Sequence, residues 1–310
     1  MSTIISTRPL PDLDTDPAGA ETILDAETDA VADPSPARRR RRRHGVWRRW
    51  GFWVAVILTV VTLASAAFPG LFIDGDPNAT DTANRFLPPS WAHPFGTDQL
   101  GRDVFARFIH GGQTTLYAAS IALSISVLGG LAIGVVAGYS HRFVDSFLMR
   151  AVDVALAIPG LLLSLAVITA LGFGTENVAI AVGVGGIPSF ARITRSEVLR
   201  VKVIPYVEAS RALGGGWLGT LLRHVLPNSW GPVLVLAVLE LGAVILSIAA
   251  LSFLGFGATP PDAEWGSLIS DGRDFLASAW WLTTLPGLAV AVLVYSINHI
   301  ARTIDEALER

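Results

Sequence analysis

Six long apolar stretches constrain what this 310-residue chain can fold into. They cover roughly residues 51–69, 114–138, 151–173, 177–191, 232–254 and 281–300. About 20 mostly apolar residues are enough for a helix to cross the hydrocarbon core of a bilayer. The fourth stretch is the weakest, because Gly183, Gly185, Gly186 and Pro188 interrupt it. The pattern predicts an all-α membrane protein with six transmembrane helices.

The composition supports a membrane protein and excludes several kinds of site. Charged residues make up 16% of the chain, whereas an ordinary soluble domain has about 25%. The sequence contains no cysteine, which excludes disulfides, thiolate metal sites and cysteine nucleophiles. Its only lysine, Lys202, follows Val201, so it cannot complete a Gly-Lys-Ser/Thr phosphate-binding loop. We therefore expect no catalytic residue, no metal and no ATP in this chain.

The N-terminal region has an uneven distribution of charge. Residues 1–37 carry eight acidic residues and one arginine, with no apolar periodicity, which predicts a disordered acidic tail. Six arginines follow at 38–43, and they begin a basic segment that covers residues 38–50. We interpret this segment as an anchor on anionic membrane lipid. Nucleic-acid binding is the alternative, and the apolar stretch that follows at once argues against it.

The basic residues also predict the orientation of the helices. With the arginine-rich flank in the cytoplasm, the cytoplasmic segments hold 19 of the 23 Lys and Arg residues. The outer segments, roughly 70–113, 174–176 and 255–280, hold four basic and ten acidic residues. Because loops rich in Lys and Arg stay in the cytoplasm, we expect both termini there. Residues 114–301 would form a core of five helices, and 302–310 a cytoplasmic tail.

Small residues and prolines within the apolar stretches concern helix packing. Gly130, Gly134 and Gly138 repeat every four residues and line one face of a helix, so that another backbone can approach closely. This face is expected either to pack inside the subunit or to meet a partner subunit. Pro159 and Pro286 lie inside apolar stretches, where neighbouring groups must satisfy the freed carbonyls and either proline could mark a kink that moves.

The longest cytoplasmic loop, 192–231, has the pattern of two short helices. Pro205 interrupts the loop, and residues 206–213 then mix apolar and polar side chains as a short amphipathic helix does. Three glycines at 214–216 end that helix or turn the chain. Leucines in 218–227 begin a second apolar face that stops at a proline. We expect two short helices, arranged in an L beside the membrane.

This loop resembles the EAA loop of bacterial ABC-importer permeases. Glu208-Ala209-Ser210 is followed after three residues by Gly214, and after nine more by the sequence His-Val-Leu-Pro at 224–227. Ser210 stands where that family usually has alanine. Residues 93–104 (HPFGTDQLGRDV) and the block within 251–273 are similar to signatures of the C-type subunits in the dipeptide, oligopeptide and nickel branch. The resemblance covers about 93–273.

The resemblance implies the type I ABC importer permease fold and a place in the bacterial inner membrane. It also implies a second, B-type permease subunit, two ATPase subunits or one fused ATPase carrying ATP and Mg, and an extracytoplasmic substrate-binding protein. No nucleic acid is expected. Di- or oligopeptides are the expected cargo, with nickel complexes and glutathione as alternatives. A proton-coupled secondary transporter is a less favoured class, because it usually has acids or bases in several helices.

In this family the first short helix of the loop couples the permease to the ATPase. The residues that the resemblance assigns to this coupling are Tyr206, Val207, Glu208, Ala209, Ser210, Leu213, Gly214, His224, Leu226 and Pro227. We expect the side chains of Tyr206, Val207 and Leu213 to fill a groove on the ATPase. Glu208 is expected to orient or cap the helix, and Gly214 to allow the turn after it.

Two further groups of residues are candidates for function. At the outer surface, the candidates for contact with the binding protein are the acidic and aromatic residues Asp98, Asp103, Asp262, Glu264 and Trp265, together with Arg102. Alternatively, Arg102–Asp103 and Glu264–Trp265 hold the outer loops together. Glu240 lies in the fifth apolar stretch, where a charge costs about 2.5 kcal/mol or more, so it should face protein or water. It either meets the charged amino end of a substrate, makes a structural hydrogen bond or lies at the membrane interface.

Overall fold

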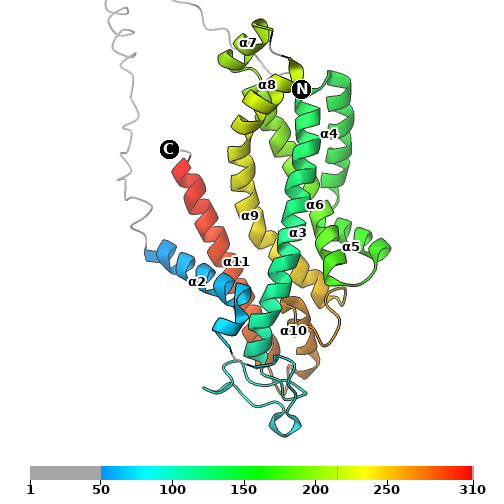
Figure 1. Ribbon diagram of the computed structural model, residues 1–310. Coiled ribbons are helices and arrows are strands. Elements are labelled where there is room, and N and C mark those ends of the chain that lie inside the picture. Colours follow the sequence, from blue (N-terminus) through cyan, green and yellow to red (C-terminus); the bar gives the residue numbers. More distant parts are fainter. Residues whose placement is uncertain (1–49, 74, 215, 309–310) are drawn as a thin grey trace, which may run out of the picture. The chain divides into compact units, whose positions relative to one another are not determined.

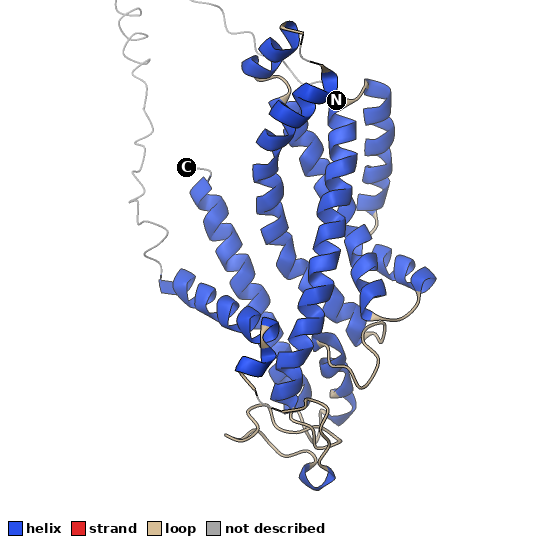
Figure 2. Cartoon of the chain, in the orientation of Figure 1, coloured by secondary structure: helices blue, strands red, loops and turns tan. Residues whose placement is uncertain are grey.

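The computed structural model describes residues 50–308 except 74 and 215. The predicted acidic tail (1–37) and the predicted basic segment up to residue 49 lie outside the described residues. The described part falls within one compact unit, Val46–Arg310, and is mostly helical (Figures 1 and 2). No β-strand occurs in this part of the chain, where Thr97 and Asp103 form an isolated antiparallel bridge.

The helices follow one another with short connections, except for the long segment before α3. Their order is α2 (Trp50–Ala67), η2 (Pro69–Leu71), η3 (Thr82–Asn84), α3 (Val104–Tyr139), α4 (Arg142–Ala157), α5 (Gly160–Leu171), α6 (Thr175–Val201), α7 (Pro205–Ala212), α8 (Trp217–Thr220), η4 (Leu221–Val225), α9 (Leu226–Phe253), α10 (Trp265–Asp271), η5 (Arg273–Phe275) and α11 (Trp281–Leu308). The turn η4 is π-helical and joins α8 to α9 without a break.

Five helical segments of the described chain are long and apolar enough to cross a membrane. They are Trp50–Ala67, Val104–Tyr139, Thr175–Val201, Trp217–Phe253 and Trp281–Ile304. The pair α4–α5 would be a sixth span, but it is bent by 97° at its break. The predicted stretch 151–173 is therefore divided between two helices, and the break lies at Pro159, one of the two prolines marked in the sequence as sites of a kink. A residue before proline avoids the helical region, and Ile158 accordingly has φ −90° and ψ 130°.

The second and fourth spans are longer than their apolar stretches. α3 begins at Val104 rather than near 114, because Asp103 Oδ1 accepts hydrogen bonds from the amides of Phe105 and Ala106 at 2.7 and 3.2 Å. α6 continues to Val201, so the predicted loop 192–231 starts inside a helix. α11 likewise continues to Leu308 and takes in most of the predicted tail.

The glycine repeat of α3 packs against α6 within the same chain. A Cβ atom built at Gly134 would lie 2.5 Å from Thr194 Cβ and 2.6 Å from the carbonyl oxygen of Ala191. Gly130 and Gly138 are equally tight against the same helix. Of the two interpretations of this repeat, the structure therefore supports close packing inside the subunit.

The alternating helix directions gather the connections at two ends of the bundle (Figure 1). α7 and α8 lie at one end, which we call the α7 end, and α10 lies at the other, the α10 end. Between them, α3, α6, α9 and α11 share a core that Trp265 of α10 extends. Side chains such as Ile57 and Val61 on α2 are exposed, as expected of a helix that faces lipid.

Candidate functional site

The coupling helix predicted from the sequence is α7, and the body of the chain holds it through Val207. The Val207 side chain is 0% exposed. It packs in a cluster, called here the α7 anchor, whose other buried members come from α3, α6 and η4: Tyr139, Val198, Val201, Leu221 and Val225. Val207 therefore cannot fill a groove on another protein in this arrangement, contrary to our expectation. α7 is fixed to three spans through this residue.

Polar and aromatic contacts surround the α7 anchor. Lys202 Nζ donates to the carbonyl oxygen of Gly138 at 2.9 Å, which joins the end of α6 to the end of α3. The Tyr139 hydroxyl donates to the carbonyl oxygen of Trp217 at 3.3 Å, and the two rings lie 5.3 Å apart. The rings of Tyr206 and His224 meet edge to face at 6.0 Å. The predicted loop is thus a connected unit, to which His224 contributes a half-buried ring.

The outward face of this unit is apolar and open. Leu213 is 90% exposed, and Tyr206, Trp217, Leu218 and Leu222 are also exposed. Glu208 and Ala209 are exposed as well, and Ser210 lines an open hollow of about 530 Å³ whose other walls are Gly216, Gly219, Thr220, Leu222, Arg223 and His224. Large apolar side chains exposed on neighbouring elements are typical of a site of protein–protein contact.

The turn after α7 and the second half of the loop differ in how well they were predicted. Gly214 has φ +88°, a conformation that favours glycine, as expected for the turn. The second short helix of the expected L is not separate, because α8 continues through η4 into α9. Leu226 and Pro227 lie where η4 passes directly into α9, so Pro227 does not end a helix.

At the α10 end, Asp98 and Arg102 organise the segment before α3. Arg102 Nε donates to Asp98 Oδ2 at 2.6 Å, and both side chains are buried. The other carboxylate oxygen, Asp98 Oδ1, accepts from the amides of Leu100 and Arg102 at 2.8 and 2.9 Å. Asp103 caps α3 and its Oδ2 lies 2.9 Å from His93 Nδ1. Arg102 therefore pairs with Asp98 and not with Asp103.

Glu264 and Trp265 are buried completely, at 0% exposure. Glu264 accepts hydrogen bonds from Ser252 Oγ at 2.7 Å, from the amide of Ala258 at 2.8 Å and, more weakly, from Thr175 Oγ1 at 3.4 Å. These donors come from α9, the segment after it and the start of α6. The Trp265 indole N–H donates to the carbonyl oxygen of Phe108 at 2.9 Å, and the two rings stack at 5.3 Å.

These contacts favour the structural alternative for the outer candidates. Direct contact with a binding protein is not compatible with the complete burial of Glu264 and Trp265 in this structure. Asp98 and Arg102 are buried against each other, and Asp103 is engaged as a cap. Among the acidic and aromatic candidates, Asp262 is exposed.

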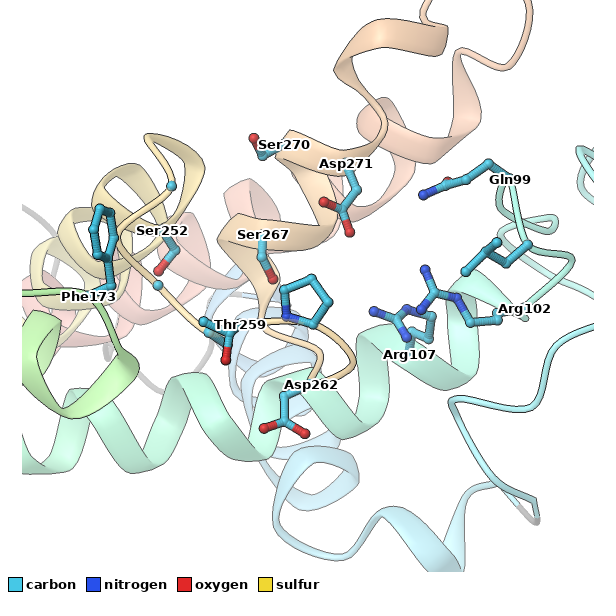
Figure 3. A pocket seen from close by; sticks show the side chains of 15 residues that line it. Gln99, Arg102, Arg107, Phe173, Ser252, Thr259, Asp262, Ser267, Ser270 and Asp271 are labelled. Carbon is cyan, nitrogen blue, oxygen red and sulfur yellow. The ribbon is translucent and has the colours of Figure 1, made fainter.

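Two charged residues were not singled out from the sequence as functional. Arg107 and Asp271 line a pocket of about 420 Å³ at the α10 end, together with Arg102 and Asp262 (Figure 3). The surrounding protein partly desolvates the Asp271 carboxylate, which raises its pKa. Placing the start of the second span near 114 assigned Arg107 to a loop, although it lies in the first turns of α3. The position of Arg107 just before an apolar stretch could have indicated that it lies in the helix.

Glu240 is half-buried in α9, where the sequence placed it. Its carboxylate forms no hydrogen bond or ion pair with any residue that the structure describes, which does not support the structural hydrogen bond. Its predicted place in the substrate pathway stays a prediction.

The comparisons with known proteins agree with this architecture. Residues 130–310 match the family described as "Binding-protein-dependent transport system inner membrane component". The chain belongs to this family. It is thus a multi-pass inner-membrane permease, as the resemblance of the EAA-like loop and its flanking blocks predicted.

Several curated proteins are similar over most of their length. A putative peptide transport system permease protein of Brucella suis biovar 1 is 37% identical over 275 residues, or 89% of this chain and 92% of that protein. The di/tripeptide transport system permease protein DppC of Pseudomonas aeruginosa is 39% identical and covers 72% of this chain and 75% of its own. The glutathione transport system permease protein GsiD of Pectobacterium atrosepticum is 37% identical, covering 85% and 89%.

A solved structure supports the fold. A chain from inward-facing conformations of the MetNI methionine ABC transporter matches 66% of this chain and 97% of its own, with a TM-score of 0.54 at 18% sequence identity. At this identity the likeness concerns the fold alone. Together with the family match, it confirms the predicted type I ABC importer permease fold.

Proposed function

We propose that this chain forms one half of the translocation pathway of an ATP-driven importer of short peptides. The observation that carries the proposal is the 37% identity, over 89% of the chain, to a permease named for peptide transport. In this proposal the other half is a B-type permease subunit, and an extracytoplasmic binding protein delivers the peptide. ATP and Mg bind to two ATPase subunits or one fused ATPase, and this chain binds no cofactor and no nucleic acid.

We place the α7 end in the cytoplasm, together with both termini. The segments at the α10 end hold four of the 23 basic residues, namely Arg85, Arg102, Arg107 and Arg273. The basic residues at the α7 end include Arg142, Arg200, Lys202 and Arg223. This asymmetry supports the orientation, because positively charged loops stay on the cytoplasmic side.

The proposed coupling surface is the exposed face of α7 and the turn after it. Leu213 and Tyr206 are the apolar side chains of the predicted set that can enter a groove on the ATPase, with Glu208 on the same exposed helix. Val207 has a different role from the expected one. Through the α7 anchor, it would pass a displacement of α7 to the ends of α3, α6 and α9.

A pair of matched variants tests the coupling surface. Leu213→Asp places a charge on the proposed interface, whereas Leu71→Asp places the same charge on an equally exposed leucine at the α10 end. We expect Leu213→Asp to reduce the amount of co-purified ATPase at least tenfold, and Leu71→Asp to retain it. Wild-type amounts of ATPase with Leu213→Asp would remove Leu213 from the interface.

Uptake measurements test the cargo. Membrane vesicles containing the complete importer should accumulate radiolabelled di- and tripeptides when the binding protein and ATP are supplied. Glutathione is the second candidate cargo, because a glutathione permease is 37% identical to this chain. A nickel complex is the remaining alternative. Accumulation of glutathione or nickel in place of alanyl peptides would refute the peptide proposal and leave the importer assignment unchanged.

A further inference from the structure

The pocket at the α10 end has the size and walls of a small-molecule site. Its volume of about 420 Å³ lies in the range of about 300–1,000 Å³ that is usual for ligand pockets. The start of α3 with the segment before it forms one wall, and α10 with the segment after α9 forms the other. Phe173, Leu100 and Pro260 contribute apolar surface. The pocket lies away from the proposed coupling surface on α7.

Arg107 supplies a positive charge whose hydrogen-bonding capacity is not exhausted. Its side chain is 2% exposed and lines the pocket. Nη1 donates to Asn78 Oδ1 at 2.7 Å and, at 3.4 Å, to the carbonyl oxygen of Pro261. The buried Nε atom has no hydrogen-bond partner among the described residues. Because buried donors are normally paired, a carboxylate that enters the pocket would meet a cation able to form further bonds.

The same pocket also carries negative charge. Asp262 and Asp271 line it, and the structure records no hydrogen bond or ion pair from either carboxylate to a described residue. Figure 3 shows the Asp271 carboxylate and the Arg102 and Arg107 guanidinium groups turned toward the same space. Arg102 is already paired with Asp98 at 2.6 Å. Arg107, Asp262 and Asp271 form no ion pair with a described residue, so they remain available to the charged groups of a ligand.

We propose that this pocket binds a short peptide in its zwitterionic form. The ammonium group lies toward Asp262 and Asp271, and the terminal carboxylate lies toward Arg107. The hydroxyls of Ser267 and Ser270 donate to backbone carbonyl groups at 3.0 Å each, so their lone pairs stay available to peptide N–H groups. This inference rests on the proposed import of peptides and gives the cargo a first binding site on the permease.

The absence of cysteine from the sequence makes a labelling experiment direct. Thr259→Cys introduces a thiol at an exposed position of the pocket wall, and Ser278→Cys introduces one at an exposed position outside it. The permease–ATPase complex is purified without its binding protein, and the rate at which a maleimide labels this chain is measured. Saturating alanyl-alanine should slow labelling of Thr259→Cys at least fivefold. N-acetyl-alanyl-alanine amide, which lacks both charges, should slow neither variant.

A second substitution tests the role of charge. Asp262→Asn, added to Thr259→Cys, should raise the dipeptide concentration for half-protection about fivefold, as expected on losing an exposed ion pair. Equal protection by the uncharged peptide, or no shift with Asp262→Asn, overturns the inference. Absence of protection in a complex that still imports alanyl-alanine also overturns it, and leaves the proposed function standing. Protection in a complex that imports no peptide supports the pocket and refutes the proposed function.

Discussion

Replacing Val207 with alanine should loosen α7 without altering its exposed surface. α7 has eight residues, and a helix this short is not stable in isolation, so its structure depends on packing. Val207 is the residue through which α7 enters the α7 anchor. Val207→Ala keeps the helix propensity at least as high as in the natural chain. Its effect therefore reports on the lost packing.

The expected size of the effect follows from the buried side chain. Val207→Ala removes the equivalent of two CH₂ groups, each worth about 0.8 kcal/mol when buried. The cavity that remains raises the loss to about 2 kcal/mol. Since about 1.4 kcal/mol corresponds to a tenfold change in an equilibrium constant, α7 should detach about 30-fold more often.

Amide hydrogen exchange measures this detachment. The amides of Val207 and Glu208 donate to the carbonyl oxygen of Ile204 at 2.9 and 3.2 Å, and that of Leu213 donates to Ala209 at 3.0 Å. In Val207→Ala these amides should exchange about 30-fold faster, because exchange follows local opening. Leu213→Ala removes a side chain of similar character from the exposed face and should leave exchange within twofold.

Two outcomes would refute this reasoning. Exchange in Val207→Ala within threefold of the unmodified protein would mean that the α7 anchor does not hold the helix. Equal acceleration in Leu213→Ala would mean that α7 is stabilised by its outer face.

In the assembled importer, Val207→Ala should also lower peptide uptake per ATP hydrolysed, since a loose α7 transmits less movement.

Three further predictions concern other parts of the chain. Gly134→Ala forces a methyl group to 2.5 Å from Thr194 Cβ and should destabilise the subunit by about 1–3 kcal/mol in thermal unfolding, whereas Gly231→Ala, which has open space around it, should not. Gly214→Val places a β-branched residue at φ +88°, at a cost of about 1–3 kcal/mol; uptake should fall while membrane insertion persists, and unchanged uptake would contradict the proposed role of the turn. Burial raises the pKa of Asp271, so its stabilising contribution is complete below the unfolded pKa of about 3.9 and is lost as pH rises through the folded pKa. Asp271→Asn should flatten this part of the pH–stability profile, and an unchanged profile would count against the desolvation of Asp271.

Hydropathy predicted the spans well because each needs only a long apolar segment. It could not predict the 97° bend between α4 and α5. Pro159 shows that the helix must break, but the angle depends on what the two halves pack against. The interrupted fourth stretch was hard to assign because its glycines weaken the apolar signal. In the structure, Gly183 and Gly186 bring α6 close to α3, where Ser126 Oγ donates to the carbonyl oxygen of Gly183 at 2.8 Å.

The sequence predicted a short coupling helix at the position of α7, but it did not predict which of its side chains are buried. Tyr206, Val207 and Leu213 are all apolar, and hydropathy gives no rule for which of them turns inward on such a short helix. The burial of Glu264 was unexpected for another reason. An acidic residue in a loop is normally exposed, whereas Glu264 obtains its hydrogen bonds from α9 and α6, which lie far from it in sequence.

The length of α3 has a mechanical consequence. Its 36 residues make a rod of about 54 Å, well beyond the roughly 30 Å hydrocarbon thickness of a bilayer. Near one tip, the carbonyl group of Phe108 holds the indole of Trp265, and at the other tip Tyr139 joins the α7 anchor. A translation or tilt of one end of α3 would displace the other end as well. A displacement at one side of the membrane can therefore reach the other side through a single helix, without successive rearrangements of side chains.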